Sequence, residues 1–214
     1  MTVSKHRKIA KAATEVFIAK GYTTASVDEI AMQAGVSKQT VYKHFGNKER
    51  LFLAVSMAAT DAITGELAAQ LDASRTGTAD FQSELSAFAR TLARMVLTPE
   101  ITALRRLVMN EVGRFPTLGR TWYAHGPGRV VTQLTPRLRE LNDKGLLSID
   151  DPERAAEDFN WLVLAAPQNK MLFGATRSFT DKEIDAIATH AVNLFIAAHR
   201  PTSGRRAGGR AVGT

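Results

Sequence analysis

The sequence predicts an all-α protein: an N-terminal three-helix helix-turn-helix domain followed by a larger helical domain. Apolar residues recur at helical spacing along most of the chain. Two-residue alternation between hairpin turns is absent from the sequence, so strands are not expected. Glycines, prolines and capping residues divide the apolar pattern into helices of ordinary length.

The first fifty residues predict three helices and the start of a fourth. The boundaries are marked by Gly21, Ser26, Gly35, Ser37, Gly46 and Asn47. Glycine can supply the left-handed residue that ends a helix, and the side chains of serine and asparagine can accept hydrogen bonds from unpaired backbone amides at a helix start. Ser26 and Glu29 have the spacing of a capping box. The fourth helix should continue to about Leu71.

Residues 72–80 are rich in small and polar residues and are expected to form a loop. Five further helices are expected over residues 81–96, 99–113, 131–145, 152–167 and 181–199. The proline and glycine breaks at 115–116 and 126–128 predict a short interrupted segment between the second and third of these helices. Pro136 predicts a kink.

Positive charge is concentrated at the two ends of the chain. The formal net charge is +7. Residues 1–50 hold nine Lys and Arg against four acidic residues, residues 200–214 hold four Arg and no acid, and the region between has a net charge of −2. This distribution favours a nucleic-acid-binding N-terminal module over a merely basic soluble surface. The basic tail at 200–214 has no apolar face and is expected to be disordered.

The composition restricts the chemistry and the location of the protein. The chain has no cysteine, which excludes disulfides and cysteine-based metal sites. Residues 1–10 are polar and basic, unlike a signal peptide, and the weakly polar stretch at 51–60 is too short to span a bilayer. A soluble, cytoplasmic protein with no membrane partner is expected.

The third helix has the features of a recognition helix. Val41 and Phe45 are spaced to face the core, which leaves its polar residues free to meet DNA. Lysine and glutamine can read guanine and adenine edges, whereas threonine and tyrosine can contact bases or phosphates. Lys48 would contact a phosphate near the start of the fourth helix. The expected DNA-binding residues are Ser26, Ser37, Lys38, Gln39, Thr40, Tyr42, Lys43, His44 and Lys48.

A longer string of residues makes this interpretation specific. Residues 12–52, above all 21–31, 34–45 and 47–52, closely resemble the DNA-binding domain of the TetR family. Parts of residues 106–175 are similar to the AefR-like C-terminal domain of some TetR regulators; they are 106–111, 114–116, 118–119, Tyr123, 126–127, 145–146 and 151–156. The resemblance implies a helical core that binds inducers and dimerises through its last two long helices. It names no ligand.

Large side chains concentrate in the second half of the chain, where they can either line a pocket or simply fill the core. A small, largely apolar effector is expected there, with His125 or Asn169 orienting a polar group. The candidate ligand-binding residues are Met109, Phe115, Trp122, Tyr123, His125, Trp161, Asn169 and Phe173. Arg105 and Arg106 are interpreted as a solvated face, with ion pairs or contact to a polar ligand as alternatives.

Catalytic and metal-binding patterns are absent from the sequence. His125, Glu111 and the acids Glu153, Glu157 and Asp158 do not form a known catalytic or metal-ligand spacing such as H-E-x-x-H. The nucleophile string G-x-S-x-G is also absent. No catalytic residue, metal or cofactor is therefore expected, and the protein is predicted not to be an enzyme.

Together, these patterns predict a homodimeric transcriptional regulator, a repressor that a small molecule releases from a near-palindromic double-stranded DNA operator. The domains are a helix-turn-helix domain at 1–50, a ligand-binding and dimerisation domain at 51–199, and the tail at 200–214. Two alternatives remain open: a constitutive DNA-binding or architectural protein without an effector, and a helical enzyme with an accessory DNA-binding module.

Overall fold

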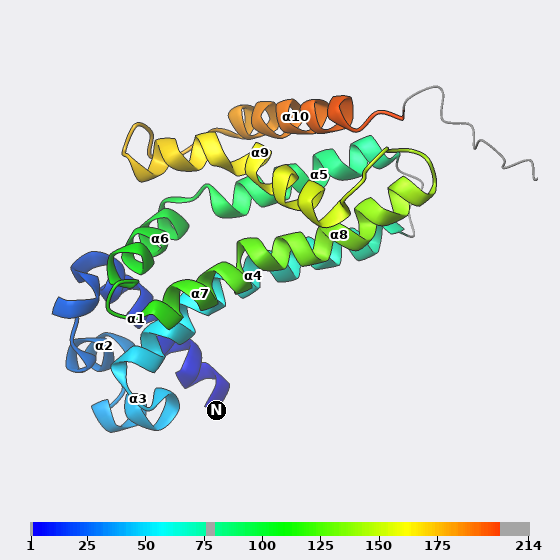
Figure 1. The fold of residues 1–214 in the computed structure, drawn as a ribbon. Helices are drawn as coiled ribbons and strands as arrows, with labels where there is room; N and C mark the ends of the chain where they lie inside the picture. The colour runs from blue at the N-terminus through cyan, green and yellow to red at the C-terminus, as the bar shows by residue number, and fades with distance from the viewer. Residues whose placement is uncertain (1, 76–79, 202–214) are drawn as a thin grey trace, which may run out of the picture.

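The computed structural model describes residues 2–75 and 80–201, which form ten helices and no strand (Figure 1). The all-α prediction is confirmed. The helices are α1 (Thr2–Thr24), α2 (Val27–Ala34), α3 (Lys38–Phe45), α4 (Lys48–Arg75), α5 (Phe81–Val96), α6 (Pro99–Glu111), α7 (Pro116–His125), α8 (Pro127–Asp143), α9 (Pro152–Leu172) and α10 (Asp181–Ala198). Of the basic tail expected at 200–214, residues 202–214 lie outside the described residues.

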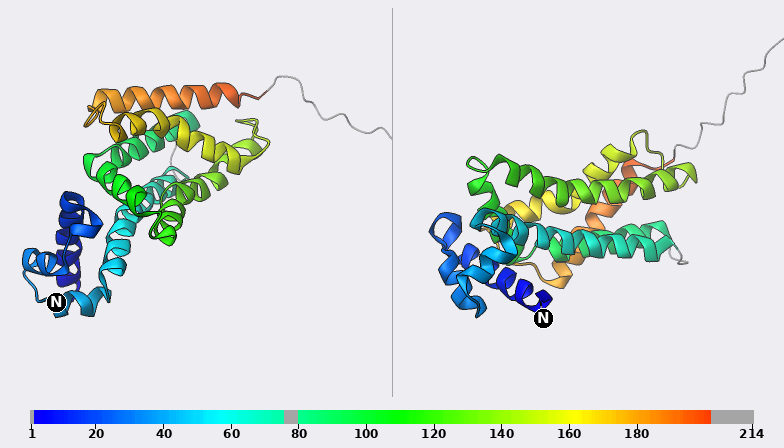
Figure 2. Two further views of the ribbon diagram at one scale, coloured as in Figure 1. Left: turned by 60° about the vertical axis from the view of Figure 1, so that its left-hand side comes forward. Right: turned by 90° about the horizontal axis from the view of Figure 1, so that it is seen from below.

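Helices α1 to α3 gather around the first turns of α4 at one end of the molecule (Figures 1 and 2). Their apolar faces form one buried cluster, in which Ile9, Phe17, Ile30 and Phe52 are almost inaccessible to solvent. The expected end of the first helix at Gly21 appears as a kink: Gly21 has φ 76° and ψ 168°, and one more turn follows to Thr24. Only glycine adopts such a conformation readily.

The predicted caps form in this N-terminal part. The Ser26, Ser37 and Asn47 side chains accept hydrogen bonds from the backbone amides three residues later, at 3.1, 3.1 and 2.8 Å. Gly35 ends α2 in the left-handed conformation, with φ 66°. The capping box expected at Ser26 is half formed, because the Glu29 carboxylate pairs with Lys20 Nζ at 2.6 Å. Short local hydrogen bonds thus fix where the two helices of the helix-turn-helix begin and end.

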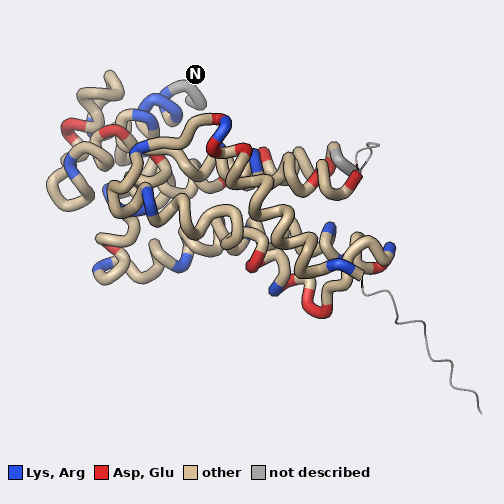
Figure 3. Tube along the Cα trace, turned by 90° about the horizontal axis from the view of Figure 1, so that it is seen from above, with Lys and Arg blue, Asp and Glu red and all other residues tan. Residues whose placement is uncertain are grey.

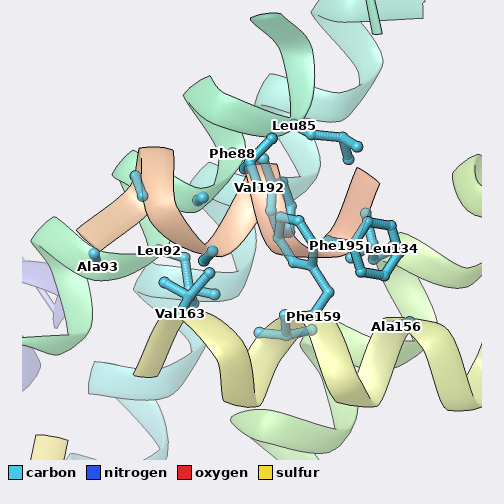
Figure 4. Close-up of a cluster of buried hydrophobic side chains, with 14 of the residues drawn as sticks. Leu85, Phe88, Leu92, Ala93, Leu134, Ala156, Phe159, Val163, Val192 and Phe195 are labelled. Carbon is cyan, nitrogen blue, oxygen red and sulfur yellow. The ribbon is translucent and has the colours of Figure 1, made fainter. Parts of the chain in front are cut away.

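The rest of the protein is a helical body that α4 joins to the N-terminal helices. In Figure 1, α8 lies along α4, while α5, α9 and α10 form the opposite side of the body. Phe88, Phe159 and Phe195 meet in the core between these helices (Figure 4). The rings of Phe159 and Phe195 are perpendicular, with centroids 5.1 Å apart, which is a favoured aromatic geometry.

Three predicted boundaries are wrong. In each case the chain is helical beyond the expected limit, and in two of them a proline marks the expected limit. Pro116 and Pro127 occupy the first turns of α7 and α8, where a missing N–H costs nothing, so the expected interrupted segment is helical. Helix α4 continues to Arg75, beyond the predicted end at Leu71. Helix α9 continues through Pro167 to Leu172, and α8 likewise contains Pro136.

Helix α4 is apolar and long enough, over Lys48–Ala73, to satisfy length and composition criteria for a membrane span. Half of its most apolar stretch is buried inside the protein, however, and the helix packs against α1, α5, α7 and α8. A core helix of a soluble protein has this character, and the contacts of α4 account for its composition.

Candidate nucleic-acid interface and internal pocket

Helix α3 presents a polar face to solvent. Val41 and Phe45 are buried against the N-terminal core, as predicted. Lys38, Gln39, Tyr42 and Lys43 are exposed on the remaining surface, and Thr40 and His44 are half-buried. The residues that the sequence proposes for base reading are thus brought to one surface. That surface belongs to the second helix of a helix-turn-helix, the element that enters the major groove in this motif.

Some of these residues also make contacts within the protein. Lys38 Nζ donates to Asp28 of α2 at 2.8 Å, and this hydrogen bond raises the pKa of Lys38. Both side chains are largely exposed, so the ion pair is weak and its exchange for a DNA contact would cost little. The Ser37 and Thr40 hydroxyls lie 2.9 Å apart. The exposed polar face is therefore held in place without being strongly committed to internal partners.

Lys48 lies at the corner between α1 and α4. Its Nζ donates to the Thr23 carbonyl at 3.2 Å and lies 4.6 Å from the centre of the Tyr22 ring. Burial, followed by repulsion from Arg114, lowers the pKa of Lys48. An ammonium has three donors, and the backbone carbonyl takes only one of them, so Lys48 can still approach an anion at the start of α4.

The structure adds basic residues that the sequence analysis did not place in a site. Lys5, Arg7 and Lys8 are exposed on the first turns of α1, where Figure 3 shows a run of basic residues. His6 of the same turns packs on Phe45, with ring centroids 4.6 Å apart, so this end of α1 lies beside α3. The excess of positive charge in residues 1–50 was the only signal for these side chains.

A pocket lies inside the body, between α4, α5, α6, α7, α8 and α9. Its cavity volume is about 40 Å³, within about 490 Å³ of non-atom space that includes open solvent, so the free space is narrow. Its walls are mainly apolar and are formed by Ile63, Leu92, Val96, Ile101, Trp122, Val130, Trp161 and Leu164. Polar groups enter it from Arg105, Asn160, Gln168, Thr60 and Thr64. Such a combination is typical of small-molecule sites.

Two of the eight candidate ligand residues, Trp122 and Trp161, line this pocket. Met109, Tyr123 and Phe173 are exposed, and Phe173 is 87% accessible because it follows the last turn of α9. Asn169 is also exposed, and its side-chain amide donates to the Ala165 carbonyl.

The remaining two candidates make contacts elsewhere. The ring of Phe115 packs on Tyr22, with centroids 5.1 Å apart. His125 Nδ1 lies 3.3 Å from a carboxylate oxygen of Asp61. The aromatic cluster seen in the sequence therefore divides between the pocket, the surface and the contact with the N-terminal domain.

Of the polar pocket lining, sequence reasoning considered only Arg105, as one alternative, and missed Thr60, Thr64, Asn160 and Gln168. The solvated face expected at Arg105 and Arg106 holds for Arg106, which is exposed, but not for Arg105. Arg106 donates to the carbonyls of Met171 and Leu172 at the end of α9, while Arg105 is half-buried at the pocket. Asn160 sits among the apolar residues of α9, and this polar residue within a buried stripe was the available signal.

An aromatic contact joins the body to the N-terminal domain. Arg114 lies over the rings of both Tyr22 and Phe115, at 5.7 and 5.1 Å from their centroids. Trp122 belongs to the buried cluster that extends from α1–α3 into α6 and α7, and it also lines the pocket. We call Tyr22, Arg114 and Phe115 the interdomain joint. A continuous packed region thus connects the pocket wall to the helix-turn-helix.

A helix-turn-helix with an exposed polar recognition helix, carried on a helical body with an internal pocket, defines a DNA-binding transcriptional regulator. Residues 9–55 match the model of bacterial regulatory proteins of the tetR family, and residues 83–201 match that of the AefR-like transcriptional repressor C-terminal domain. The second match alone covers more than half of the chain. The chain belongs to the TetR family of transcriptional regulators.

Individual proteins agree with this assignment. A TetR-family regulator from Mesorhizobium loti is 32% identical, with a TM-score of 0.85 over 94% of this chain and 98% of that one. The flavonoid-responsive regulator FrrA is 29% identical, with a TM-score of 0.71 over 93% and 98%. The transcriptional activator FasR of Mycolicibacterium smegmatis is 57% identical over 44 residues, which are 21% of this chain and 20% of FasR.

Within the described residues, no group of three or more His, Cys, Asp or Glu side chains is placed to hold a metal ion. The residues considered for acid–base chemistry are also separated: His125 pairs with Asp61, whereas Glu153, Glu157 and Asp158 lie on α9, two of them beside Arg154. The polar groups that do converge are those that line the pocket.

Proposed function

We propose that the protein is a cytoplasmic, homodimeric repressor that binds a near-palindromic double-stranded DNA operator and releases it when a small, largely apolar molecule occupies the pocket. The observation that carries the proposal is the packed connection from Trp122 in the pocket wall, through the interdomain joint, to the helix-turn-helix. A ligand that prefers a different spacing of the recognition helices lowers DNA affinity by its difference in affinity for the two states.

The effector part of the proposal is supported by the pocket and by one relative. FrrA is described as flavonoid-responsive, and two tryptophan rings in an apolar pocket suit an aromatic ligand. Repression of transcription is supported by the AefR-like repressor match over residues 83–201, whereas FasR is described as an activator. Expression of a reporter gene behind the selected operator, with and without the regulator, decides between repression and activation.

The direct test selects operator DNA with the purified full-length protein at stated salt, then titrates small molecules while following operator affinity and tryptophan fluorescence. Both signals should change together with a ligand of the pocket. A broad apolar library that leaves operator affinity unchanged would favour the alternative, a constitutive DNA-binding protein.

Residues of α3 are expected to set sequence specificity. Replacing Lys38 or Gln39 by alanine should change the preferred base at one operator position and cost about 1–3 kcal/mol if the side chain makes a bidentate base contact. Lys48→Ala should instead weaken binding to all sequences alike and reduce the salt slope by about one unit. Repeating the selection with each variant checks this, and unchanged base preference in both α3 variants would contradict it.

Dimerisation is assigned to α9 and α10. Leu162 and Leu194 are exposed on these helices at 40% and 46%, among exposed alanines that permit close helix approach. Leu194→Glu should therefore raise the dimer dissociation constant by at least about tenfold, because it places a charge in an apolar interface. Sedimentation across a concentration series measures the shift, with Leu146→Glu, at an exposed leucine between α8 and α9, as the control.

The same dimer should place its recognition helices about 34–36 Å apart, one turn of DNA, and select a site with dyad symmetry. A wild-type monomer at micromolar concentration, or a selected site without a dyad, would count against the assignment.

The proposed domain limits are residues 1–50 for DNA binding and 51–199 for ligand binding and dimerisation.

A further inference from the structure

Arg105 places a positive charge at the pocket without an internal counterion. It is half-buried on α6, and among the described residues no ion pair or hydrogen bond to its guanidinium is found. Burial lowers the pKa of Arg105, and no acidic neighbour offsets that effect. A half-buried arginine without a counterion is less favourable than a fully hydrated one, because it loses part of its hydration and gains no ion pair in return.

Asn160 is a second unsatisfied polar group in the same lining. Its side chain is 1% exposed on α9, and neither its amide nitrogen nor its amide oxygen has a hydrogen-bond partner among the described residues. Buried amides are normally hydrogen-bonded, so this exception calls for an explanation. The Thr60 and Thr64 hydroxyls, in contrast, already donate to the backbone carbonyls of Met57 and Thr60.

The unused polar capacity of the pocket is therefore mainly that of donors: a guanidinium with up to five N–H groups and an amide with two. Around these donors the lining is apolar, with Trp122 and Trp161 as its largest side chains. A neutral apolar ligand would leave Arg105 and Asn160 unsatisfied. A ligand with an anionic group and an apolar body would satisfy the donors and the apolar part of the lining.

We propose that the pocket binds a small amphipathic carboxylate, whose carboxylate is paired with Arg105 and hydrogen-bonded by Asn160 while its apolar body lies against Trp122 and Trp161. Arginine suits this role because its planar fork matches the two oxygens of a carboxylate. The cavity volume of about 40 Å³ is far below the roughly 300–1,000 Å³ of ligand sites, so the side chains that line the pocket must separate as the ligand enters. This inference rests on the proposed function, because it specifies the effector of the same site.

The test uses the full-length protein and matched probes at pH 7.5: biphenyl-4-carboxylate, dodecanoate, and the corresponding neutral amides. Calorimetry and tryptophan fluorescence measure binding. The wild type should bind at least one carboxylate about 10- to 100-fold more tightly than its amide, the difference expected for a hydrogen-bonded charge. Arg105→Met should remove this preference while leaving the affinity for the amide within a factor of about three.

The controls separate a ligand contact from a structural role. Arg105→Met should be as stable to heat as the wild type or more stable, because it removes an unpaired charge. If Arg105 had a structural partner, the same substitution would lower the melting temperature. Arg139→Met, at an exposed arginine of α8, should leave the carboxylate preference unchanged. Asn160→Leu should weaken carboxylate binding several-fold.

The outcomes also distinguish this inference from the proposed function. If carboxylates bind no better than amides, if Arg105→Met keeps the preference, or if none of the probes binds, the carboxylate inference is overturned. The ligand response in the proposed function falls if no member of a broader library that includes neutral and cationic compounds changes operator affinity.

Discussion

Replacing Arg137 by methionine is expected to lower the free energy of unfolding at pH 7 by about 3–5 kcal/mol. Arg137 Nε and Nη2 donate to the two oxygens of Glu84, at 2.8 and 2.5 Å, and join α8 to α5. The Glu84 side chain is only 2% exposed. Removing the guanidinium leaves a buried carboxylate without its counterion, which is far less favourable than the intact pair. Denaturant unfolding followed by circular dichroism measures the loss.

The control is Glu140, the second carboxylate partner of Arg137, which lies toward solvent on the same helix. Hydrogen bonds from Lys144 and then Arg137 lower the pKa of Glu140 to about 2. Glu140→Gln should cost less than about 1 kcal/mol, because exposed ion pairs contribute little. Since the folded-state pKa lies below the usual value, this small contribution is present at neutral pH and should disappear as the pH falls from about 4.5 toward 2.

A double variant identifies the reason for the loss. Glu84→Leu combined with Arg137→Leu should recover most of the stability lost in Arg137→Met, because a buried ion pair can often be replaced by apolar side chains at little cost. Equal stability of Arg137→Met and Glu140→Gln would contradict the prediction, because the buried ion pair would then contribute no more than the exposed one.

Local chemistry explains why much of the fold could be predicted. Ser26, Ser37, Asn47 and Thr180 each start a helix by accepting a hydrogen bond from an amide three residues away, which sequence spacing alone reveals. The buried positions of α3 follow equally from helical periodicity. These features depend on neighbours in the chain and need no knowledge of the tertiary structure.

The pocket could not be predicted to the same degree, because it depends on how six helices meet. Arg105 and Arg106 are adjacent in sequence but project about 100° apart around α6, so one reaches the pocket and the other the end of α9. Phe173 lies one residue beyond α9 and is therefore exposed. Aromatic content alone does not distinguish such positions from a pocket wall.

The packing also limits where a signal can pass between the two domains. Helix α4 runs from the helix-turn-helix to the pocket, where Thr60, Ile63 and Thr64 form part of the lining. Helices α6 and α7 reach the N-terminal domain through the interdomain joint, and α7 carries Trp122 into the pocket. A ligand that displaces Trp122 would act on α7, whose N-cap residue Phe115 packs on Tyr22.

Phe115→Ala is therefore expected to uncouple the pocket from the DNA. In the wild type, a saturating pocket ligand should weaken operator binding by about 5- to 150-fold, the usual range of allosteric coupling. Without the Phe115 ring, Tyr22 and Arg114 lose their contact with the start of α7. The ratio of the operator dissociation constants with and without ligand should then fall to within about threefold of unity. Ligand affinity of the DNA-free protein should change little, because Phe115 does not line the pocket. Fluorescence anisotropy of labelled operator measures the ratio.

Thermodynamic reciprocity provides an internal check on this result, because the operator must weaken ligand binding by the same factor that the ligand weakens operator binding. Both factors should collapse together in Phe115→Ala. Phe173→Ala, at an exposed phenylalanine, should keep the wild-type ratio. Phe115→Leu, which retains an apolar contact with Tyr22, should give an intermediate ratio. If Phe115→Ala remains folded and keeps full coupling, the signal does not pass through the interdomain joint, and α4 becomes the route to test.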